Sequence, residues 1–438
     1  MDAEPAERAA GRSGGARWAL TVVFGINGLL IASMAVRTPS VKIDLDLSDG
    51  QLGLLSGLFG VAGVLAMQTT GALTARFGSR TIVRIVTAVL PVLLIGIGLA
   101  PQYLAMATLQ VAFGALYGTL DVSMNVHAVA WERATKRRIM SRCHGAWSIG
   151  SISGALLGSG AAHVGMSRTE HYALLCAVLV PAALVAGQFL MPTPAGPTEA
   201  SGRREQRTGK GQRPGQRPGQ RTGRRTGWTR PLLVFGAMGA TVLTAEAAVI
   251  SWSGVFLHDD RRASLGLSGL GYVAFALCQM SLRLVGDRIQ ARVPAARLLR
   301  RGGVAAAAGV GVVVLGPWPW VGIAGFGIMG LALSLCLPVL FGAVGHFGAE
   351  TGGGDAGAAT MLSRFSTMTY TGILVGPALI GWVADHLGLS WTLALLAPPL
   401  LAVAAAARAV DLRAPRPARP PASPPPTDTA ARAGTLPG

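Results

Sequence analysis

The most informative shortage in this 438-residue sequence is of charge, because Asp, Glu, Lys and Arg make up only 13% of it while 51% is hydrophobic. Soluble globular proteins carry about 25% charged residues. The charge that remains is unbalanced: 38 basic residues against 20 acidic ones give a net charge of +18. Such a balance could indicate a nucleic-acid binder. The bases, however, stand in short interruptions between apolar runs long enough to cross a bilayer, which favours a membrane protein without a nucleic-acid partner.

Further absences narrow the function. The four cysteines form no CxxC pair and three lie inside apolar runs, so neither a metal site nor a disulfide is predicted. The Gly-rich stretch TGGGDAG (Thr351–Gly357) lacks the GK[ST] ending of a P-loop. No nucleophile–base arrangement is present either. We therefore expect no cofactor, no ATP coupling and no enzymatic reaction. The first apolar run is too long for a cleavable signal and is expected to remain as a helix.

Apolar runs of about 20 residues, the length of a membrane-spanning helix, recur along the chain. We predict an all-α integral membrane protein with twelve spans, near residues 17–36, 51–73, 82–100, 103–130, 142–163, 170–191, 231–257, 266–284, 303–317, 319–345, 357–384 and 390–410. The predicted organisation is a disordered N-terminal region (1–16), a six-helix bundle (17–191), a basic disordered linker (192–230), a second six-helix bundle (231–410) and a disordered tail (411–438). The linker repeats Gly, Gln, Arg and Pro and cannot bury a core; contact with anionic lipid or nucleic acid is its alternative role.

The distribution of bases orients the spans. Twelve spans place both termini and the linker on one side, and that side carries most of the loop bases: Arg8, Arg12, Arg17, Arg76, Arg80, Arg84, Arg133, Lys136, Arg137, Arg138, Arg142, Arg283, Arg288, Arg292, Arg297, Arg300 and Arg301. The other side has only Arg37, Lys42, Arg168, Arg261 and Arg262. Loops rich in Lys and Arg stay in the cytoplasm, so both termini are predicted to be cytoplasmic. Scarce Lys beside abundant Arg, Ala and Gly fits a GC-rich bacterial genome, and hence a bacterial plasma membrane.

Two loops in corresponding places of the two halves resemble each other. GALTARFGSR (Gly71–Arg80) follows the second span, and RLVGDRIQAR (Arg283–Arg292) follows the eighth. The first loop resembles the motif G-x-L-a-D-R-x-G-R-K/R of the major facilitator superfamily; the matching residues are Gly71, Leu73, Arg76, Gly78 and Arg80. Ala75 replaces the motif's Asp and Ser79 the first of its closing bases. In the second loop Asp287 and Arg288 keep the acid–base pair, while Arg283 stands where the leading Gly would be.

This resemblance covers roughly residues 17–410. It implies that these loops clamp neighbouring helices and set the balance between inward-facing and outward-facing states. It also implies a central cavity lined by helices 1, 4, 7 and 10. A narrower resemblance links the chain to bacterial permeases that neighbour fucose permease; the stretches are Arg37–Pro39, Asp121–Asn125, His144–Ser148, Glu246–Ala248, Trp252–Ser253 and Gly376–Pro377. That group usually has an acid before the Trp of helix 7, where this chain has Ser251.

An acid inside the fourth predicted span carries the functional hypothesis. Asp121 lies about ten residues from the end of that span, or ~15 Å deep at 1.5 Å per residue, near the middle of a ~30 Å core. A charge there is costly unless it is paired, hydrated or neutralised. Asn125 shares its helix face, and Glu132 returns to the same stripe nearer the cytoplasmic end. We predict that Asp121 couples protons or contacts substrate; the alternative is a hydrogen bond that holds two helices together.

Three other residues, Glu246, Asn27 and Trp252, are expected to serve the same cavity, and Glu132 and His144 are expected to belong to the cytoplasmic gate or conformational motif. Glu246 lies midway along the seventh span, so the two halves would each contribute an acid to a cavity between them. Asn27 in the first span is a cavity ligand or an interhelical hydrogen-bond partner. Trp252 either stacks a ring-bearing substrate or anchors the span at the membrane interface. His144 at the start of the fifth span is a proton or gate residue, or a helix-start hydrogen bond.

Together these features predict a monomeric secondary active transporter whose partners are a small organic solute, protons and the lipid bilayer. Analogy with basic, Ala-rich bacterial members of the superfamily slightly favours export. The alternative is proton-linked uptake of a sugar-like or other polar nutrient, which Asp121 and Asn125 would serve. A non-transporting receptor built on a transporter fold is the alternative from another class.

Overall fold

The computed structural model describes residues 3–192, 228–352 and 355–411, and the regular secondary structure in these ranges is helical. The helices of the first half are α1 (Ala3–Val36), α2 (Thr38–Asp44), α3 (Asp49–Phe77), α4 (Ser79–Leu99), α5 (Tyr103–Thr135), α6 (Met140–His163) and α7 (Arg168–Phe189). Those of the second half are α8 (Arg230–Asp259), α9 (Leu265–Ser268), α10 (Leu270–Leu284), α11 (Gly286–Gln290), α12 (Ala295–Leu315), α13 (Pro319–Leu333), α14 (Cys336–Gly352), α15 (Asp355–Leu387), α16 (Leu389–Ala394), α17 (Ala397–Ala406) and α18 (Arg408–Asp411).

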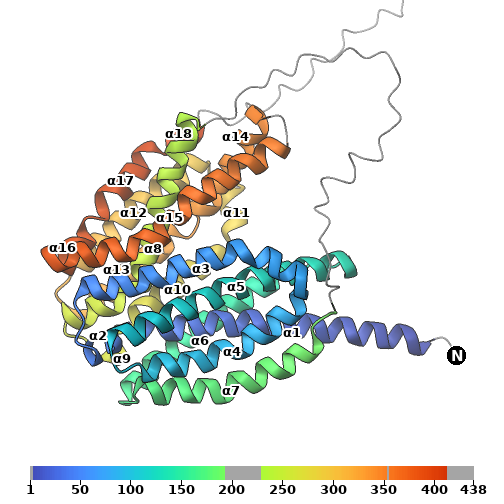
Figure 1. Cartoon of the computed structure of the whole chain (residues 1–438). Helices are drawn as coiled ribbons and strands as arrows, with labels where there is room; N and C mark the ends of the chain where they lie inside the picture. The colour runs from blue at the N-terminus through green and yellow to red at the C-terminus, as the bar shows by residue number, and fades with distance from the viewer. Residues whose placement is uncertain (1–2, 193–227, 353–354, 412–438) are drawn as a thin grey trace, which may run out of the picture.

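The helices form two groups. Within the first, α1 packs on α6, α3 on α5 and α4 on α7; within the second, α8 packs on α15, and α13 on both α10 and α12. Figure 1 shows the first group below the second, with the short helices α2, α9 and α16 together at one end. We call this the loop end. The opposite end, where α7 finishes and α8 begins, is the linker end. The groups meet mainly where α3 packs on α15 and α6 on α9 and α10.

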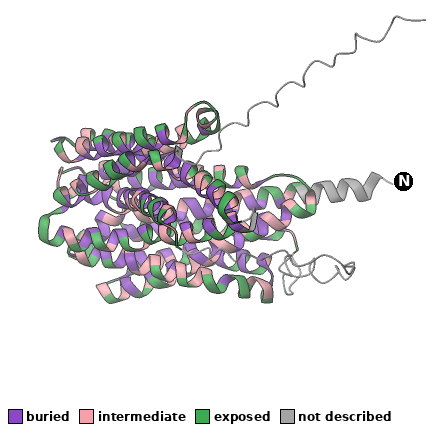
Figure 2. Cartoon of the chain, turned by 90° about the horizontal axis from the view of Figure 1, so that it is seen from above, coloured by how far each residue is buried: buried purple, intermediate pink, exposed green. Residues whose placement is uncertain are grey.

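The outer surface of the helices is apolar, as a bilayer requires. Buried residues lie between the helices and exposed residues on their outer faces (Figure 2). Several of these exposed residues are large and hydrophobic, including Leu65, Leu104, Val178 and Leu315. Eleven stretches of the described chain are long and apolar enough to cross a membrane. α6 corresponds to the remaining predicted span, and its many Gly and Ser residues explain its lower hydropathy.

The structure corrects two predicted boundaries. α1 begins at Ala3, so residues 3–16, predicted to be disordered, extend the first span as helix. Lengthening an existing helix avoids the cost of nucleation, and Ala, Glu and Arg are good helix formers. α12 begins at Ala295, eight residues before its predicted start, because Ala, Leu and Arg continue a helix although Arg lowers hydropathy. Residues 193–227 and 412–438, which hold nearly all of the predicted linker and tail, lie outside the described ranges.

Glycines allow α1 and α6 to pack closely. A Cβ placed on Gly150 would overlap the backbone of Gly25, and one on Gly154 would overlap the backbone of Leu29. Small residues every four positions along α6 therefore serve close helix packing.

Replacing Gly150 by Ala is expected to destabilise the protein by about 1–3 kcal/mol, the usual effect of overpacking, because backbone atoms cannot move aside as a flexible side chain would. Gly160 lies on the same helix, and a Cβ there would meet nothing within 4 Å. Gly160→Ala is the matched control and should leave stability unchanged or raise it. Thermal unfolding of the two purified variants in detergent measures the difference; equal unfolding temperatures would contradict the packing argument.

Candidate functional site

A cluster of charges joins the two halves at the loop end. The Lys42 ammonium, on α2, donates hydrogen bonds of 2.5 Å to the carboxylates of Asp49 and Asp259. Asp49 starts α3, whereas Asp259 ends α8 in the other half. The Ser48 hydroxyl also donates to the Asp385 carboxylate across the halves, at 3.1 Å. We call these five residues the loop-end bridge.

Closer to the middle of the molecule the halves are in van der Waals contact. A Cβ on Gly53 of α3 would meet the Pro377 carbonyl oxygen and the Gly381 Cα of α15. On the other side, Ser151 of α6 and Tyr272 of α10 share a buried hydrogen bond of 2.7 Å. From these contacts the two groups of helices diverge toward the linker end (Figure 1). This conformation is therefore closed at the loop end.

Asp121 lies near the middle of α5, and its surroundings come from both halves. It is half-buried. Tyr117 and His144 of the first half interact with it electrostatically, as does Tyr370 of α15 in the second half. Asn125, on the same face of α5, bonds to the backbone of Asp121: its side-chain amide donates to the Asp121 carbonyl oxygen at 2.8 Å. The Asp121 carboxylate is thus not held by Asn125.

Glu132 belongs to the α5–α6 connection and not to the surroundings of Asp121. Its carboxylate accepts hydrogen bonds from the backbone N–H groups of Ile139 and Met140, at 2.6 and 3.0 Å. These donors belong to the first turn of α6, whose N–H groups lack partners within the helix. Glu132 therefore fixes the start of α6.

Asn27 is fully buried and contacts α6. Its side-chain oxygen accepts a 2.9 Å hydrogen bond from the indole N–H of Trp147. This bond is the interhelical alternative that the sequence left open, and it fixes one edge of the Trp147 ring. His144, one turn earlier, is exposed and packs edge-on against Phe24, with ring centroids 5.6 Å apart. The Ser148 hydroxyl donates to the His144 carbonyl oxygen, so these two residues meet through the backbone.

Glu246 of α8 is buried, and the cation nearest to it was not foreseen as its partner. An Arg283 guanidinium nitrogen lies 3.7 Å from the Glu246 carboxylate. Arg283, predicted to stand in the loop motif, instead belongs to the last turn of α10 and reaches back to the acid. A Glu on one predicted span and an Arg at the end of the next were the only sequence signals for this pair.

The same arginine supports a break in the tenth span. This span consists of α13 and α14, which are separated at Ser334 and Leu335. Pro338 has no N–H, so the Ser334 carbonyl four residues earlier lacks its helical partner. Arg283 Nε donates to that carbonyl at 3.3 Å, and the Ser334 hydroxyl donates to the Gln279 carbonyl oxygen at 3.0 Å. Interrupted helices at mid-membrane are a feature of transporter sites.

Replacing Arg283 by Leu is expected to lower gradient-driven transport on the order of tenfold, because it leaves Glu246 without its cation and the Ser334 carbonyl without its donor. Adding Pro338→Ala restores a helical N–H for Ser334 and should recover thermal stability but not transport. The unfolding temperature reports the contribution of Arg283 to the broken helix, and the transport rate reports its contribution to Glu246. If Pro338→Ala also restores transport, Arg283 acts only on the helix.

A tyrosine lies in the vicinity of each acid. Tyr272 is close enough to interact electrostatically with Glu246 of its own half and with Tyr117 of the other half. Tyr117 in turn interacts with Asp121. Tyr272 also shares a hydrogen bond with Ser151 of the first half. Tyr117 therefore lies in the vicinity of Asp121, and Tyr272 in the vicinity of Glu246, where the two halves meet. Aromatic residues scattered along apolar runs gave no sequence signal for this arrangement.

Trp252 does not share this region and is no interfacial anchor. It is 1% exposed, and its ring lies beside Gly381, where α8, α15 and α3 meet near the loop end. A buried indole cannot lie at the bilayer surface, so the alternative of an interfacial anchor is wrong.

The loop motifs take different forms in the two halves. Gly78 has φ 77°, a conformation that favours glycine, and ends α3. Arg80 donates to the Gln188 carbonyl oxygen of α7 at 3.2 Å, and the Arg76 guanidinium lies over the Phe77 ring. By contrast, a Cβ on Gly71 would meet nothing within 4 Å. Asp287 and Arg288, in α11, are exposed and form no ion pair within the described ranges.

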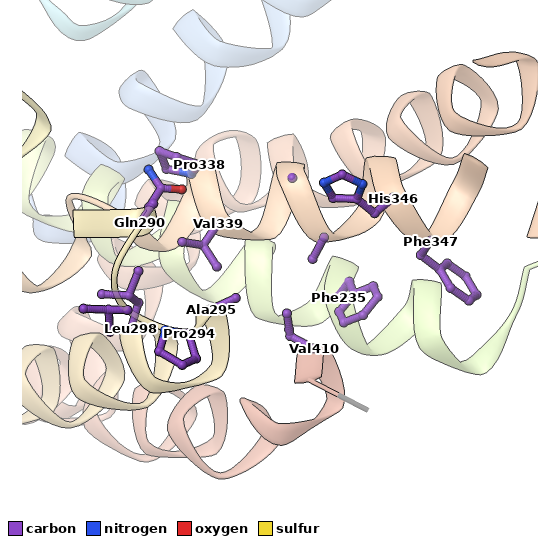
Figure 3. Close-up of a pocket in the computed structure, with 13 residues that line it drawn as sticks. Phe235, Gln290, Pro294, Ala295, Leu298, Pro338, Val339, His346, Phe347 and Val410 are labelled. Atoms are coloured by element: carbon purple, nitrogen blue, oxygen red, sulfur yellow. The ribbon is translucent and has the colours of Figure 1, made fainter. Parts of the chain in front are cut away.

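A cavity of about 440 Å³ lies away from both acids, inside the second half at the linker end (Figure 3). Its wall comes from α8, α11, α12, α14 and α18, and includes Phe235, Leu298, Val339 and Phe347. Figure 3 shows His346 and Gln290 as polar groups on this wall. Neither Asp121 nor Glu246 contributes to it. The cavity is therefore distinct from the region that the acids define.

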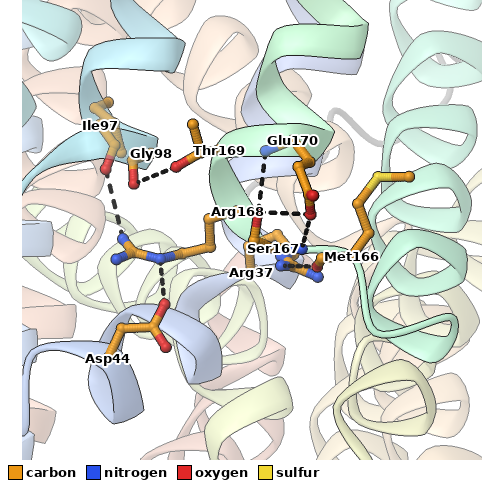
Figure 4. A network of polar contacts seen from close by, with 9 residues as sticks. All are labelled: Arg37, Asp44, Ile97, Gly98, Met166, Ser167, Arg168, Thr169 and Glu170. Carbon is orange, nitrogen blue, oxygen red and sulfur yellow. Dashed lines mark hydrogen bonds and ion pairs between the residues drawn. The ribbon is translucent and has the colours of Figure 1, made fainter.

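Two buried arginines organise the loop end of the first half (Figure 4). Arg168 Nε donates to the Asp44 carboxylate at 2.7 Å, and Arg37 donates to the Met166 carbonyl oxygen at 2.7 Å. Ser167 and Glu170 form a capping box that starts α7. These contacts hold α2 against α7 and so position Lys42 on α2.

Comparison with known proteins agrees with this architecture. A family model described as Major Facilitator Superfamily matches residues 18–361. An uncharacterized MFS-type transporter of Yersinia pestis is 32% identical over 397 residues, covering 89% of this chain and 94% of the relative. Membrane protein MosC of Rhizobium meliloti is 28% identical over 372 residues, covering 85% of this chain and 84% of MosC.

Solved structures of low sequence identity share the fold. The nucleoside transporter NupG superposes with a TM-score of 0.68 at 14% identity, covering 90% of this chain and 98% of NupG. A bacterial homolog of the human lysosomal transporter Spinster, in an inward-facing and unoccupied conformation, gives 0.65 at 15% identity, covering 93% and 99%.

The fold and the family match define the class: a multi-pass membrane transporter, not an enzyme, with the twelve-helix fold predicted from the sequence. This chain belongs to the Major Facilitator Superfamily. Members of this family sit in a lipid bilayer and act on small-molecule substrates.

Proposed function

We propose that this protein is a proton-coupled secondary active transporter of a small organic solute. Its two bundles, residues 17–191 and 231–410, rock about a central site, with both termini and the linker in the cytoplasm of a bacterial cell and the protein acting as a monomer. The observation that carries the proposal is one acid in each half, Asp121 and Glu246, each inside a membrane-spanning helix and each with a tyrosine in its vicinity. Placing an acidic side chain inside the membrane costs free energy, and such residues usually have a function in transport.

The loop-end bridge supports alternating access. With the termini cytoplasmic, a closed loop end corresponds to an inward-facing state. Opening that end requires Lys42 to leave Asp259, while the contacts of α3 with α15 separate. Tyr370, a neighbour of Asp121, belongs to the second half and would move away with it. Asp121 would then be accessible from the loop end and could exchange a proton with the solution on that side.

The arrangement at Glu246 supports a role in coupling. Arg283 is shared between the Glu246 carboxylate and the Ser334 carbonyl at the break of the tenth span. When Glu246 gains a proton it loses its charge, and Arg283 is freed to strengthen its bond to the Ser334 carbonyl or to bind a solute. Protonation at one residue would thereby change the geometry of α13 and α14.

Export remains slightly favoured by analogy with other basic bacterial members. The aromatic and polar groups near the acids favour a second candidate, uptake of a sugar-like or other polar nutrient. Tyr117, Trp147 and Tyr272 offer ring faces beside amide and hydroxyl groups, which suit a ring-bearing polar solute. Structures of similar fold include NupG and a D-xylose–proton symporter, at 14% and 15% identity.

A substrate screen in cells that lack or overproduce the protein should identify the solute. Purified protein in proteoliposomes then tests the mechanism. A pH step imposed across the membrane is expected to drive the solute against its gradient, and the direction of flux relative to the proton gradient separates symport from antiport. Binding without flux would instead support a receptor, and flux indifferent to the pH step would contradict proton coupling.

A further inference from the structure

The cavity at the linker end of the second half has the composition of a binding site for an apolar group. Its volume of about 440 Å³ falls within the range of ligand pockets, about 300–1,000 Å³. Phe235, Leu298, Val339 and Phe347 make most of the wall apolar. Gln290 and His346 are its polar side chains, and neither acid of the transport site reaches it. It is therefore separate from the two acids on which the function proposed above rests.

Positive charge surrounds this apolar wall. Four arginines stand one or two residues from residues that line the cavity, and all four are exposed: Arg288, Arg292, Arg297 and Arg408. None of them forms an ion pair within the described part of the chain, and no acidic side chain lines the cavity. Unpaired, exposed cations of one sign favour an anionic ligand.

The position of the cavity relative to the membrane further restricts the class of ligand. α12 crosses the membrane from Ala295 to Leu315, and Ala295 and Leu298 in its first turn line the cavity. The beginning of a span lies at the level of the lipid headgroups. An apolar cavity with a basic rim at this level matches an amphiphile that has an anionic head and an acyl chain.

We propose that this cavity binds an anionic phospholipid, with an acyl chain against Phe235 and Phe347 and the phosphate beside Arg292 and Arg297. The other nearby occupant would be residues 412–438 of this chain, which begin two residues after Val410 on the cavity wall. That segment contains four Arg and one Asp, so its net charge has the same sign as the rim. Charge complementarity therefore favours the lipid.

Thermal unfolding of the full-length protein in detergent tests the site, with phosphatidylglycerol and phosphatidylcholine of identical acyl chains as probes. A ligand that binds the folded state raises the unfolding temperature in proportion to its affinity and concentration. Phosphatidylglycerol is expected to raise it more than phosphatidylcholine. The double variant Arg292→Gln/Arg297→Gln should weaken apparent phosphatidylglycerol binding on the order of tenfold, since each base near the surface contributes about 1 kcal/mol.

Gly342 allows the cavity itself to be filled. It lines the cavity, and a Cβ there would meet nothing within 4 Å, so the Leu side chain of Gly342→Leu can begin without a clash and extend into the cavity space. This variant should fold and lose the phosphatidylglycerol-specific shift. Gly311→Leu is its matched control, because Gly311 of α12 is equally open but does not line the cavity, and it should keep the shift. Arg133→Gln/Arg137→Gln makes the same change of charge in the first half and should also keep it.

Four outcomes would overturn the proposal. They are an equal shift with phosphatidylcholine, a shift reproduced by inorganic phosphate alone, a shift that survives Gly342→Leu, and a shift that disappears when residues 412–438 are deleted. The last result would assign the phosphatidylglycerol effect to the C-terminal segment.

Discussion

Replacing Asp121 by Asn is expected to abolish accumulation of the solute driven by a pH step while preserving counterflow exchange. Asn keeps nearly the shape of Asp and can still hydrogen-bond, but it cannot carry a proton. Exchange needs only binding and rocking, whereas accumulation needs the movement of protons to be coupled to that of solute. We expect accumulation to fall at least about tenfold, corresponding to the loss of about 1.4 kcal/mol of coupling or more.

Two measurements on the same proteoliposomes give the answer: accumulation under an imposed pH step and counterflow without one. Asp46→Asn is the matched control. Asp46 has φ 49° in an exposed turn at the loop end, a conformation that Asn also adopts readily. This variant should retain both activities. If Asp121→Asn still concentrates solute against its gradient, Asp121 is not the coupling acid; if counterflow is lost as well, its role is in binding or structure.

The second large effect is expected at the loop-end bridge. Lys42→Met removes the cation that holds Asp49 and Asp259 together, and leaves two half-buried carboxylates facing each other. Hydrogen bonds to charged groups contribute about 1.5–3 kcal/mol each. The loss should move the population toward conformations open at the loop end by about tenfold or more.

Spin labels at two exposed positions, Val164 in the first half and Trp391 in the second, measure this change as a distance across the loop end. Lys42→Met should shift the distribution of distances between the two labels to larger values. Lys42→Arg should leave the distribution unchanged, since the positive charge is retained. In a Lys42→Met background, Asp259→Asn should add no further opening, because its partner is already gone. An unchanged distribution in Lys42→Met would show that the α3–α15 packing alone closes this end.

The pH dependence of the bridge follows from Lys42. Burial lowers the pKa of this ammonium, but its hydrogen bonds to Asp259 and Asp49 outweigh burial and raise the pKa above its ordinary value of 10.5. A raised pKa means that the bridge contributes fully below pH 10.5 and is lost only as the pH rises through the higher value. The spin-label distance should therefore not change through deprotonation of Lys42 between neutral pH and about pH 9.

The length and spacing of the apolar runs, together with the composition, were enough to determine the class of fold. The sequence indicated twelve spans in two halves through three features: apolar runs long enough to span a bilayer, basic residues confined mainly to one side, and two similar loops in corresponding places. These features are visible because a bilayer imposes its own thickness and polarity on any chain that crosses it. Asp121 and Glu246 were found for the same reason: a charge inside an apolar run is costly, so it is conspicuous. The start of α12 was missed because hydropathy measures burial in lipid, while Arg297, Arg300 and Arg301 are still good helix formers.

The partners of these residues could not be predicted, because partners depend on distances between spans that lie far apart in the sequence. Arg283 was placed in a loop motif, yet its long side chain reaches Glu246 and the Ser334 carbonyl. Trp252 was expected at the cavity or the membrane surface, and tertiary packing buries it near the loop end. Asn125 was placed on the same helix face as Asp121, but only the structure shows that its amide bonds to the Asp121 backbone carbonyl.

The sequence by itself determined that this chain spans a membrane as two helical halves with an acid in each. Only the tertiary structure decided which end is closed, because Lys42 and Asp259 are 217 positions apart and nothing local specifies their meeting. It likewise decided that Tyr117 lies in the vicinity of Asp121 and Tyr272 in that of Glu246. Helical periodicity fixes the face on which a side chain lies, whereas the packing of one helix against another fixes what that face meets.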